Sequence, residues 1–548
     1  MRNRRAGTTG RPSFARTASG LVRDWSQADA AIYNFLVMGM LTTAMPLMLL
    51  TAPAFFGGVN VPVAYLLGAL GVTPFLVVLA VLLSAMPRSG GDYVVVSRIV
   101  HPAVGFMSTT GSSTIYYCAW MAWNGWLLAQ GLSFTGTILG KVLDSAWLGV
   151  FGSWAGTTDG ILAITLLSIF LPAVLISFGM KFYAKVDYVL FAGLVVGSAL
   201  LLGVLLIGNT SNFIQSFNDF MVPYLGPNAY ETVIKTAKEA GYASNTTFSW
   251  GDTLVFAGWA IGAHIIWAWF STPHVGEIRK AGNVGQTFGS FMIPMVAASI
   301  FMVAIIVAYF NTVGMEFAGA MGYLWITGNS LATSLPFPPY YIFLPTLMFG
   351  IIPIIVALVM FGYACQLIYF QATNIYNPVK YLFAQAFDGV LPRGVAYVNR
   401  RFHTPLVAIG IMVAGGIIWM AWSWYVPGVW TYVASVAAAN LVQYCIILIA
   451  GILFPYRLKE VYKTSTWSKY NVGGVPVITI LSIFGLVPLV FSIYTYLVVP
   501  ELGAAVPASW ATITGVFLAC FLFYFISKWY RRRQGIDLEL AFKEVPPA

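Results

Sequence analysis

The chain has 548 residues, of which 59% are hydrophobic and 8% are charged. Soluble globular proteins carry about 25% charged residues, so this composition excludes an ordinary soluble domain. Lys and Arg number 28 against 18 Asp and Glu, but they fall in short segments between apolar runs. Basic residues in such segments set membrane topology, and the excess therefore does not predict a nucleic-acid partner.

Long stretches of the chain contain no charged side chain. The first runs from Ala30 to Pro87, and similar windows follow as far as residue 527. A charged group at the centre of a bilayer costs about 2.5–3.5 kcal/mol even on insertion scales. Each window holds one or two stretches of about 20 apolar residues, the length that a helix needs to cross the hydrocarbon. The pattern predicts an all-α polytopic membrane protein.

About twelve transmembrane helices are expected. They are predicted at 31–54, 62–86, 104–128, 160–180, 186–208, 253–275, 287–310, 342–370, 405–424, 429–453, 474–497 and 508–528. The expected organisation is a tail at 1–28, a membrane core at 29–500, a last helix at 501–528 and a tail at 529–548. Two connections are long. The outer loop 209–252 is predicted to contain a short amphipathic helix at 230–241, and the inner segment 371–404 has helical composition broken by Pro392 and Pro405.

The basic residues predict which side each loop faces. An even number of spans puts both termini on one side. With the N-terminus inside, only Lys141, Lys235 and Lys238 face outward, and the other 25 of the 28 basic residues lie on the inner side. This asymmetry follows the positive-inside rule, so we expect a multi-pass plasma-membrane protein with both termini cytoplasmic.

Ionisable residues are nearly absent from the predicted spans. No span carries Asp, Glu, Lys or Arg near its centre, and His264 is the one ionisable residue expected deep in a span. It is either a neutral histidine hydrogen-bonded within the bundle or a group used for substrate binding or proton coupling. The lack of a buried acid disfavours a polyamine or arginine carrier, because a second cation would have no partner.

No pattern of an enzyme is present. The four cysteines, Cys118, Cys365, Cys445 and Cys520, fall in apolar spans without paired spacing, which predicts buried free thiols. The chain contains no phosphate-binding loop, no zinc-ligand spacing and no credible catalytic triad. We therefore expect no covalent chemistry, no cofactor and no metal.

Two predicted helices carry residues that interrupt a helix in mid-span. The first contains Gly39, Thr42 and Pro46. In the sixth, Gly262 precedes His264. Such residues either serve packing, or mark a locally unwound helix whose backbone groups face a cavity. Two breaks five helices apart match an inverted repeat with a binding site at the midplane.

The third predicted helix carries an aromatic stripe. Tyr116, Trp120 and Trp123 lie on one face at helical spacing, with Asn124 beside them. Stripes of this kind serve packing or an interfacial belt, or they form the wall of a substrate site. Both interpretations stay open.

Three polar segments resemble a known family. The run Met86–Tyr93, MPRSGGDY, followed by His101–Phe106, HPAVGF, resembles the loop between helices 2 and 3 of the amino acid–polyamine–organocation (APC) superfamily. Asp388–Pro392, DGVLP, resembles its segment between helices 8 and 9, and Glu277–Lys280, EIRK, resembles a degenerate form of its motif after helix 6. The resemblance covers roughly residues 25–500.

The resemblance implies a five-plus-five inverted repeat (LeuT-type) with two added C-terminal helices. In that fold, helices 1 and 6 unwind at their centres and bind an amino acid's carboxylate and amino groups through backbone atoms. Helices 3 and 8 complete the wall. Carried over to this chain, the substrate-binding residues are Gly39, Met40, Thr42, Thr43, Ala44, Tyr116, Trp120, Gly262, Ala263, His264 and Trp267.

The chain departs from the family pattern at the site. Residues 40–44 replace a glycine-rich, serine-containing break, and residues 264–269 replace an aromatic-Gly-Phe-Glu region. Helix 5 lacks the lysine of some proton-coupled members, and residues 349–357 of helix 8 lack the Ser or Thr of sodium-coupled ones. These departures point to an unusual substrate and remove support from both coupling schemes.

The expected function is secondary active transport of neutral amino acids or related amines by alternating access. Proton symport or exchange would provide the coupling, with His264 as the titrating candidate. The partners would be a small-molecule substrate, the lipid bilayer and protons. Two alternatives remain: a carrier of a non-amino-acid solute on the same fold, and a transport-silent amino acid receptor.

Overall fold

The computed structural model describes residues 21–42, 44–244, 247–349, 352–426, 435–502 and 504–543. Within these residues, ten helices are long and apolar enough to cross a membrane. They are α3 (Val61–Ala85), α8 (Thr158–Ser177), α9 (Met180–Ile207), the segment Trp250–Glu277, α13 (Val284–Val313), α17 (Pro353–Phe387), α18 (Leu406–Tyr425), α19 (Ser435–Arg457), α21 (Val477–Val498) and α22 (Pro507–Arg533). The expected all-α polytopic membrane protein is confirmed, whereas the count of twelve spans stays a prediction.

Shorter elements connect the spans. They are α4 (Gly91–Ile99), α7 (Ala146–Ala155), α10 (Thr210–Leu225), α11 (Ala229–Glu239), α14 (Met315–Ile326), α15 (Ser330–Thr333), α16 (Phe343–Thr346), η4 (Leu347–Phe349), η5 (Arg393–Ala396), α20 (Lys459–Thr464), the antiparallel strands β1 (Asn471–Val472) and β2 (Val475–Pro476), η7 (Pro500–Leu502) and α23 (Leu538–Lys543). The amphipathic helix expected at 230–241 is confirmed as α11.

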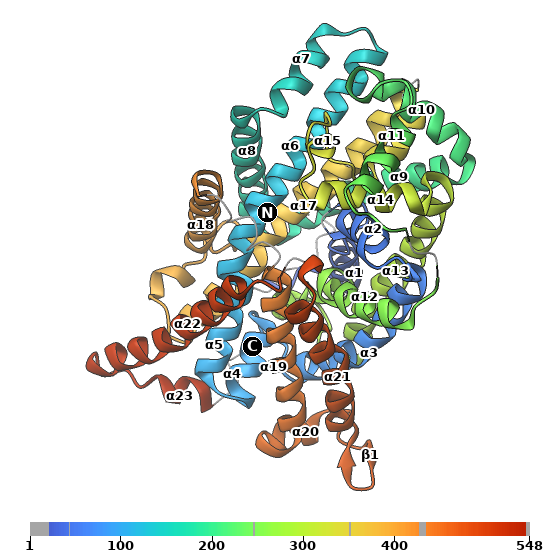
Figure 1. The fold of residues 1–548 in the computed structure, drawn as a ribbon. Helices are drawn as coiled ribbons and strands as arrows, with labels where there is room; N and C mark the ends of the chain where they lie inside the picture. The colour runs from blue at the N-terminus through green and yellow to red at the C-terminus, as the bar shows by residue number, and fades with distance from the viewer. Residues whose placement is uncertain are drawn as a thin grey trace, which may run out of the picture.

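The connecting elements separate to the two ends of the bundle. Figure 1 shows α7, α10 and α11 at one end, and α20, α23 and the β1–β2 hairpin at the other. This is the separation expected if odd and even loops lie on opposite sides of a bilayer. Between the ends, α3 packs against α12 (Trp250–Ala263), α13 and α21. α17 packs against α6 (Tyr116–Val142), α8, α9 and α18.

The first predicted span is two short helices rather than one. α1 (Gln27–Leu36) begins at a capping box formed by Ser26 and Asp29, and α2 (Ala44–Phe55) follows after a non-helical link. Gly39 in the link has φ +62°, a backbone conformation that residues with a Cβ rarely adopt. At 1.5 Å per residue, each helix is about 15–18 Å long, about half of the hydrocarbon thickness. The expected break is confirmed.

The sixth predicted span is also interrupted. α12 (Trp250–Ala263) ends at His264, whose φ of −150° and ψ of −56° are not helical. The chain continues as two 3₁₀ segments, η2 (Ile265–Trp269) and η3 (Thr272–Glu277). The break lies directly after Gly262, as expected.

Two helices extend further than the sequence predicts. The helix expected at 104–128 runs through α5 (Pro102–Thr110), the π-helix η1 (Gly111–Ile115) and α6 (Tyr116–Val142). α17 continues to Phe387, so the first half of the expected inner segment 371–404 is helical. The polar residues of this half, among them Gln371 and Asn374, are fully buried. The helical composition of this half is confirmed, and its polar side chains make contacts inside the bundle.

Candidate functional site

The link between α1 and α2 is held by side chains from other helices. Leu41 N–H donates to Gln366 Oε1 at 2.8 Å, and Gln366 Nε2 donates to the Leu36 carbonyl at 3.0 Å. The hydroxyl of Tyr341 donates to the Met40 carbonyl. Backbone groups freed by a break inside a membrane must find such partners, because no water is present to bind them. Gln366 therefore bridges the break from α17.

His264 connects the second break to α3 and to the first break. Its Nδ1 lies 2.7 Å from the hydroxyl of Tyr65. A Cβ added at Gly39 would lie 3.5 Å from both Nε2 and Cδ2 of His264, so the imidazole faces the α1–α2 link. Nε2 itself is buried and has no hydrogen-bond partner among the described residues. The two breaks thus meet at the imidazole of His264, whose Nε2 has no hydrogen-bond partner among the described residues.

An aromatic wall stands beside His264. The rings of Trp120 and Trp267 are 4.8 Å apart, and Tyr117 stacks between Trp120 at 5.9 Å and Phe270 at 5.8 Å. The indole Nε1 of Trp267 is buried without a partner in the described part of the chain. Buried polar groups are almost always paired, and these two unpaired groups lie beside the same break.

The sequence-predicted residues do not all face this centre. Gly39, Met40 and Thr42 form the link, Ala44 begins α2, and Thr43 lies outside the described residues. Trp120, His264 and Trp267 come together as expected.

Tyr116, Gly262 and Ala263 have other surroundings. A Cβ at Gly262 would lie 2.8 Å from Leu441 and 2.9 Å from Tyr496, so this glycine allows close packing against α19 and α21. Ala263 is buried in the last turn of α12. The stacking partner of Trp120 is Tyr117, one position after the expected Tyr116.

Sequence reasoning missed three polar residues that hold the breaks. Gln366 and Tyr341 bind the α1–α2 link, and Asn34 of α1 binds the segment after η2. Asn34 accepts from Ser271 N–H at 2.8 Å and donates to the Ser271 hydroxyl at 3.0 Å. For Asn34 and Gln366, the available signal was an amide side chain within a charge-free apolar run. Lipid tolerates such a group only when protein groups satisfy its hydrogen bonds.

His264 lies in the middle of the candidate span Trp250–Glu277, and other buried ionisable residues lie toward the ends of the candidate spans. The candidate spans also contain Asp187, His274, Glu277 and Lys380, each at most 3% exposed. Lys380 Nζ pairs with Glu277 Oε1 at 2.8 Å, which joins α17 to the end of η3. His274 Nε2 of η3 lies 2.8 Å from Oδ1 of Asn377, which is on α17 like Lys380. Pairing explains how Glu277, Lys380 and His274 are tolerated in an apolar bundle, whereas Oδ1 of Asp187 has no partner among the described residues.

The N-terminal segment closes the bundle over this pair. Trp25 N–H donates to the Glu277 carbonyl at 3.3 Å, and Arg279 N–H donates to the Trp25 carbonyl at 2.8 Å. The Trp25 indole donates to the Met180 carbonyl at 3.2 Å and packs 5.3 Å from the His274 ring. With Trp25 1% exposed, the α1 side of the site is closed to solvent.

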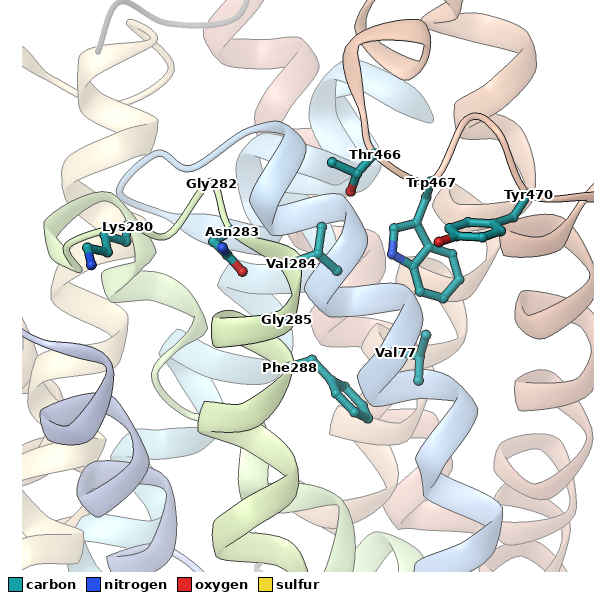
Figure 2. A pocket seen from close by; sticks show the side chains of 10 residues that line it. All are labelled: Val77, Lys280, Gly282, Asn283, Val284, Gly285, Phe288, Thr466, Trp467 and Tyr470. Atoms are coloured by element: carbon teal, nitrogen blue, oxygen red, sulfur yellow. The ribbon is translucent and has the colours of Figure 1, made fainter.

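A surface groove lies away from the two breaks. A groove of about 760 Å³ runs between the end of α3, the start of α13 and the loop before β1, lined by Val77, Phe288, Trp467 and Tyr470 among others. Figure 2 shows Lys280 and Asn283 toward one side of the groove and the rings of Trp467 and Tyr470 toward the other. None of the sequence-predicted site residues lines it.

Comparison with known proteins does not identify this chain. No protein-family model matches it, and no curated protein sequence matches it.

Proposed function

We propose that this protein is a secondary active transporter of neutral amino acids or related amines. It works by alternating access in the plasma membrane, with twelve spans arranged as a five-plus-five inverted repeat and two added helices, and with both termini cytoplasmic. It performs no covalent chemistry. The observation that carries the proposal is the meeting of two broken helices, α1–α2 and α12–η2, at the unpaired Nε2 of His264.

Broken helices suit a zwitterionic substrate. The carbonyl end of α1 carries partial negative charge and the amide end of α2 carries partial positive charge, so the two ends can attract an ammonium and a carboxylate. The aromatic rings of Trp120 and Trp267 provide an apolar surface for the side chain. A neutral side chain fits that surface without a buried counter-charge.

His264 is the proposed coupling group at the break. It is fully buried, contacts Tyr65, and directs its other nitrogen at the α1–α2 link. A substrate bound at the link would change the hydrogen bonding of that nitrogen, and this links substrate binding to the protonation of the imidazole.

The test is uptake of a labelled amino-acid mixture into proteoliposomes that contain the purified chain, with and without an inward proton gradient. Gradient-dependent accumulation of one compound supports the proposal. Fast counterflow without net uptake makes the protein an exchanger. If no amino acid moves in either format, the amino-acid proposal is wrong, and a panel of other small solutes tests the same fold as a different carrier.

A further inference from the structure

Besides Asp187 and Glu277, a further buried acid lies outside the candidate spans, in the short helix α4 that joins α3 to α5. Asp92 of α4 is 0% exposed. Its Oδ1 accepts a hydrogen bond from the Tyr381 hydroxyl of α17 at 2.7 Å, and its Oδ2 accepts one from Gln443 Nε2 of α19 at 2.6 Å. The carboxyl group therefore binds two long helices that are far apart in sequence.

The orientation of Gln443 is set by its other partners. Its Oε1 accepts from the Ser113 hydroxyl at 2.8 Å and from the Ser112 hydroxyl. Both serines lie in η1, the π-helical turn at the start of the third span. With its oxygen occupied in this way, the amide must present its N–H to Asp92. The network thus joins α4, α17, α19 and η1.

No described cation pairs with Asp92. α4 itself carries Tyr93 and Arg98, and the charged or imidazole groups on or at the ends of the elements packed against it are His101, His274, Glu277, Lys380, Asp388, Arg457, Glu539 and Lys543. Tyr117, Tyr381 and Tyr444 interact with the charge of Asp92. Arg98 pairs with Asp388 at 2.6 Å, Lys380 pairs with Glu277 at 2.8 Å, and Arg457 donates to the Val100 carbonyl at 2.6 Å. Arg98, Lys380 and Arg457 therefore have partners other than Asp92.

Two features of the surroundings of Asp92 shift its pKa in opposite directions. Burial raises the pKa of Asp92 to about 6, while the hydrogen bonds from Tyr381 and Gln443 lower it. The position in the first turn of α4 also favours the carboxylate, because amide dipoles point toward it. A carboxyl group balanced in this way can gain and lose a proton near neutral pH.

Protonation changes the hydrogen bonding between Asp92 and Tyr381. The ionised carboxylate accepts from Tyr381 and Gln443. The protonated acid still accepts from Gln443 at Oδ2, and its Oδ1–H can donate to the Tyr381 oxygen, because a phenol both donates and accepts. The Tyr381 O–H then loses Asp92 as its acceptor, so proton binding weakens the contact between α4 and α17.

The network also reaches the broken helix. Tyr444, next to Gln443 on α19, accepts a hydrogen bond from Trp269 Nε1 of η2 at 3.0 Å. Tyr117, two residues after η1, stacks against Trp120 and Phe270. A change in the hydrogen bonding of Asp92 can reach η2 through Gln443 and its neighbour Tyr444 on α19. It can reach the rings of Tyr117 and Trp120 through the serines of η1.

We propose that Asp92 is a proton-binding site whose occupancy is coupled to movement of η2 at the α12 break. The coupling part of this proposal rests on the proposed transport function, whereas proton binding by Asp92 does not. Protonation neutralises the only charge in the network, which weakens its hold on Gln443 and Tyr381, because hydrogen bonds to a charged group are about twice as strong.

The experiment uses the full chain in lipid nanodiscs and compares wild type with Asp92→Asn. An infrared titration should show a protonated-carboxyl band that disappears between about pH 5 and about pH 8 in wild type and is absent from the variant. The raised pKa means that the folded state prefers the acid form. The melting temperature of wild type should therefore fall as pH rises through about 6, while that of Asp92→Asn should not.

Two further variants make the result specific. Asp187→Asn removes another buried acid and should leave the Asp92 band unchanged. Tyr381→Phe removes one donor to the carboxylate and should shift the titration to higher pH. A wild-type band that survives Asp92→Asn, or a Tyr381→Phe titration at the wild-type pH, overturns proton binding by Asp92.

Uptake measurements separate the two proposals. If the protein transports a substrate, Asp92→Asn should lose accumulation driven by a proton gradient and retain counterflow. Gradient-driven accumulation at the wild-type level in that variant overturns the coupling. If no amino acid is transported but the Asp92 titration is present, the transport function fails and the proton site stands.

Discussion

At the scale of single residues, the α1–α2 link depends on one amide side chain. Gln366 contacts the chain on both sides of the link, through the Leu36 carbonyl and the Leu41 amide. An amide is suited to this position because it donates and accepts at adjacent atoms without carrying charge. Gly39 lies between these two contacts and faces the ring of His264.

Replacing Gln366 by Leu should destabilise the protein and weaken substrate binding together. The variant leaves a buried carbonyl and a buried amide unpaired, at a cost of about 1–3 kcal/mol for each group. Gln371→Leu is the matched control, because Gln371 is also buried on α17 but binds Met121 and Ser168. Thermal unfolding should detect both variants, whereas substrate affinity should fall only for Gln366→Leu. Equal affinities would contradict a role at the break.

Replacing His264 by Ala should remove the pH dependence of uptake that originates at the break. The change deletes the titratable ring that faces the α1–α2 link. Tyr65→Phe is the control: it keeps the imidazole but removes the hydroxyl beside Nδ1, so it should alter the pH profile without flattening it. The measurement is initial uptake between about pH 5 and about pH 8. An unchanged profile in His264→Ala excludes the coupling role.

At the scale of elements, the breaks could be predicted and the residues that hold them could not. Gly39 and Gly262 mark their positions because helix-breaking residues in an apolar run need a reason. The partner of Leu41 is 325 residues away, and no local pattern reports such a contact. The helical composition of 371–404 could be seen in the sequence, but its continuity with the span and its burial could not, because polar residues on a helix look the same whether they face water or the bundle interior.

Breaking the pair between α17 and η3 should cost far more than breaking a surface pair. Lys380→Met leaves Glu277 buried without its cation, which costs about 3–5 kcal/mol. The double variant Lys380→Met with Glu277→Gln should recover most of this loss, because no charge then remains buried. Lys463→Met, which removes an exposed pair with Glu460, should cost about 0–1 kcal/mol. Similar melting temperatures for Lys380→Met and Lys463→Met would refute the buried pairing.

At the scale of the whole molecule, the centre is closed at both ends. Trp25 and the Glu277–Lys380 pair cover it from the α1 side, and Tyr340, Tyr341 and Phe343 are at most 1% exposed on the α16 side. An alternating-access cycle requires that each of these closures opens in turn. The closure at Trp25 is built from a few contacts of a short segment, so it is the one that a single substitution can weaken.

Replacing Trp25 by Ala should shift the population toward a state open at the α1 side. The substitution removes ring contacts with Tyr33 at 4.9 Å and with His274, and the indole bond to Met180. The loss is about 3–5 kcal/mol, and it falls only on the closed state because an open state lacks these contacts. Hydrogen exchange should therefore accelerate in η3 and at the start of α1 while α8 stays protected. Trp147→Ala, at a 72% exposed ring on α7, should leave exchange unchanged. Equal exchange in wild type and Trp25→Ala would mean that other contacts keep this end closed.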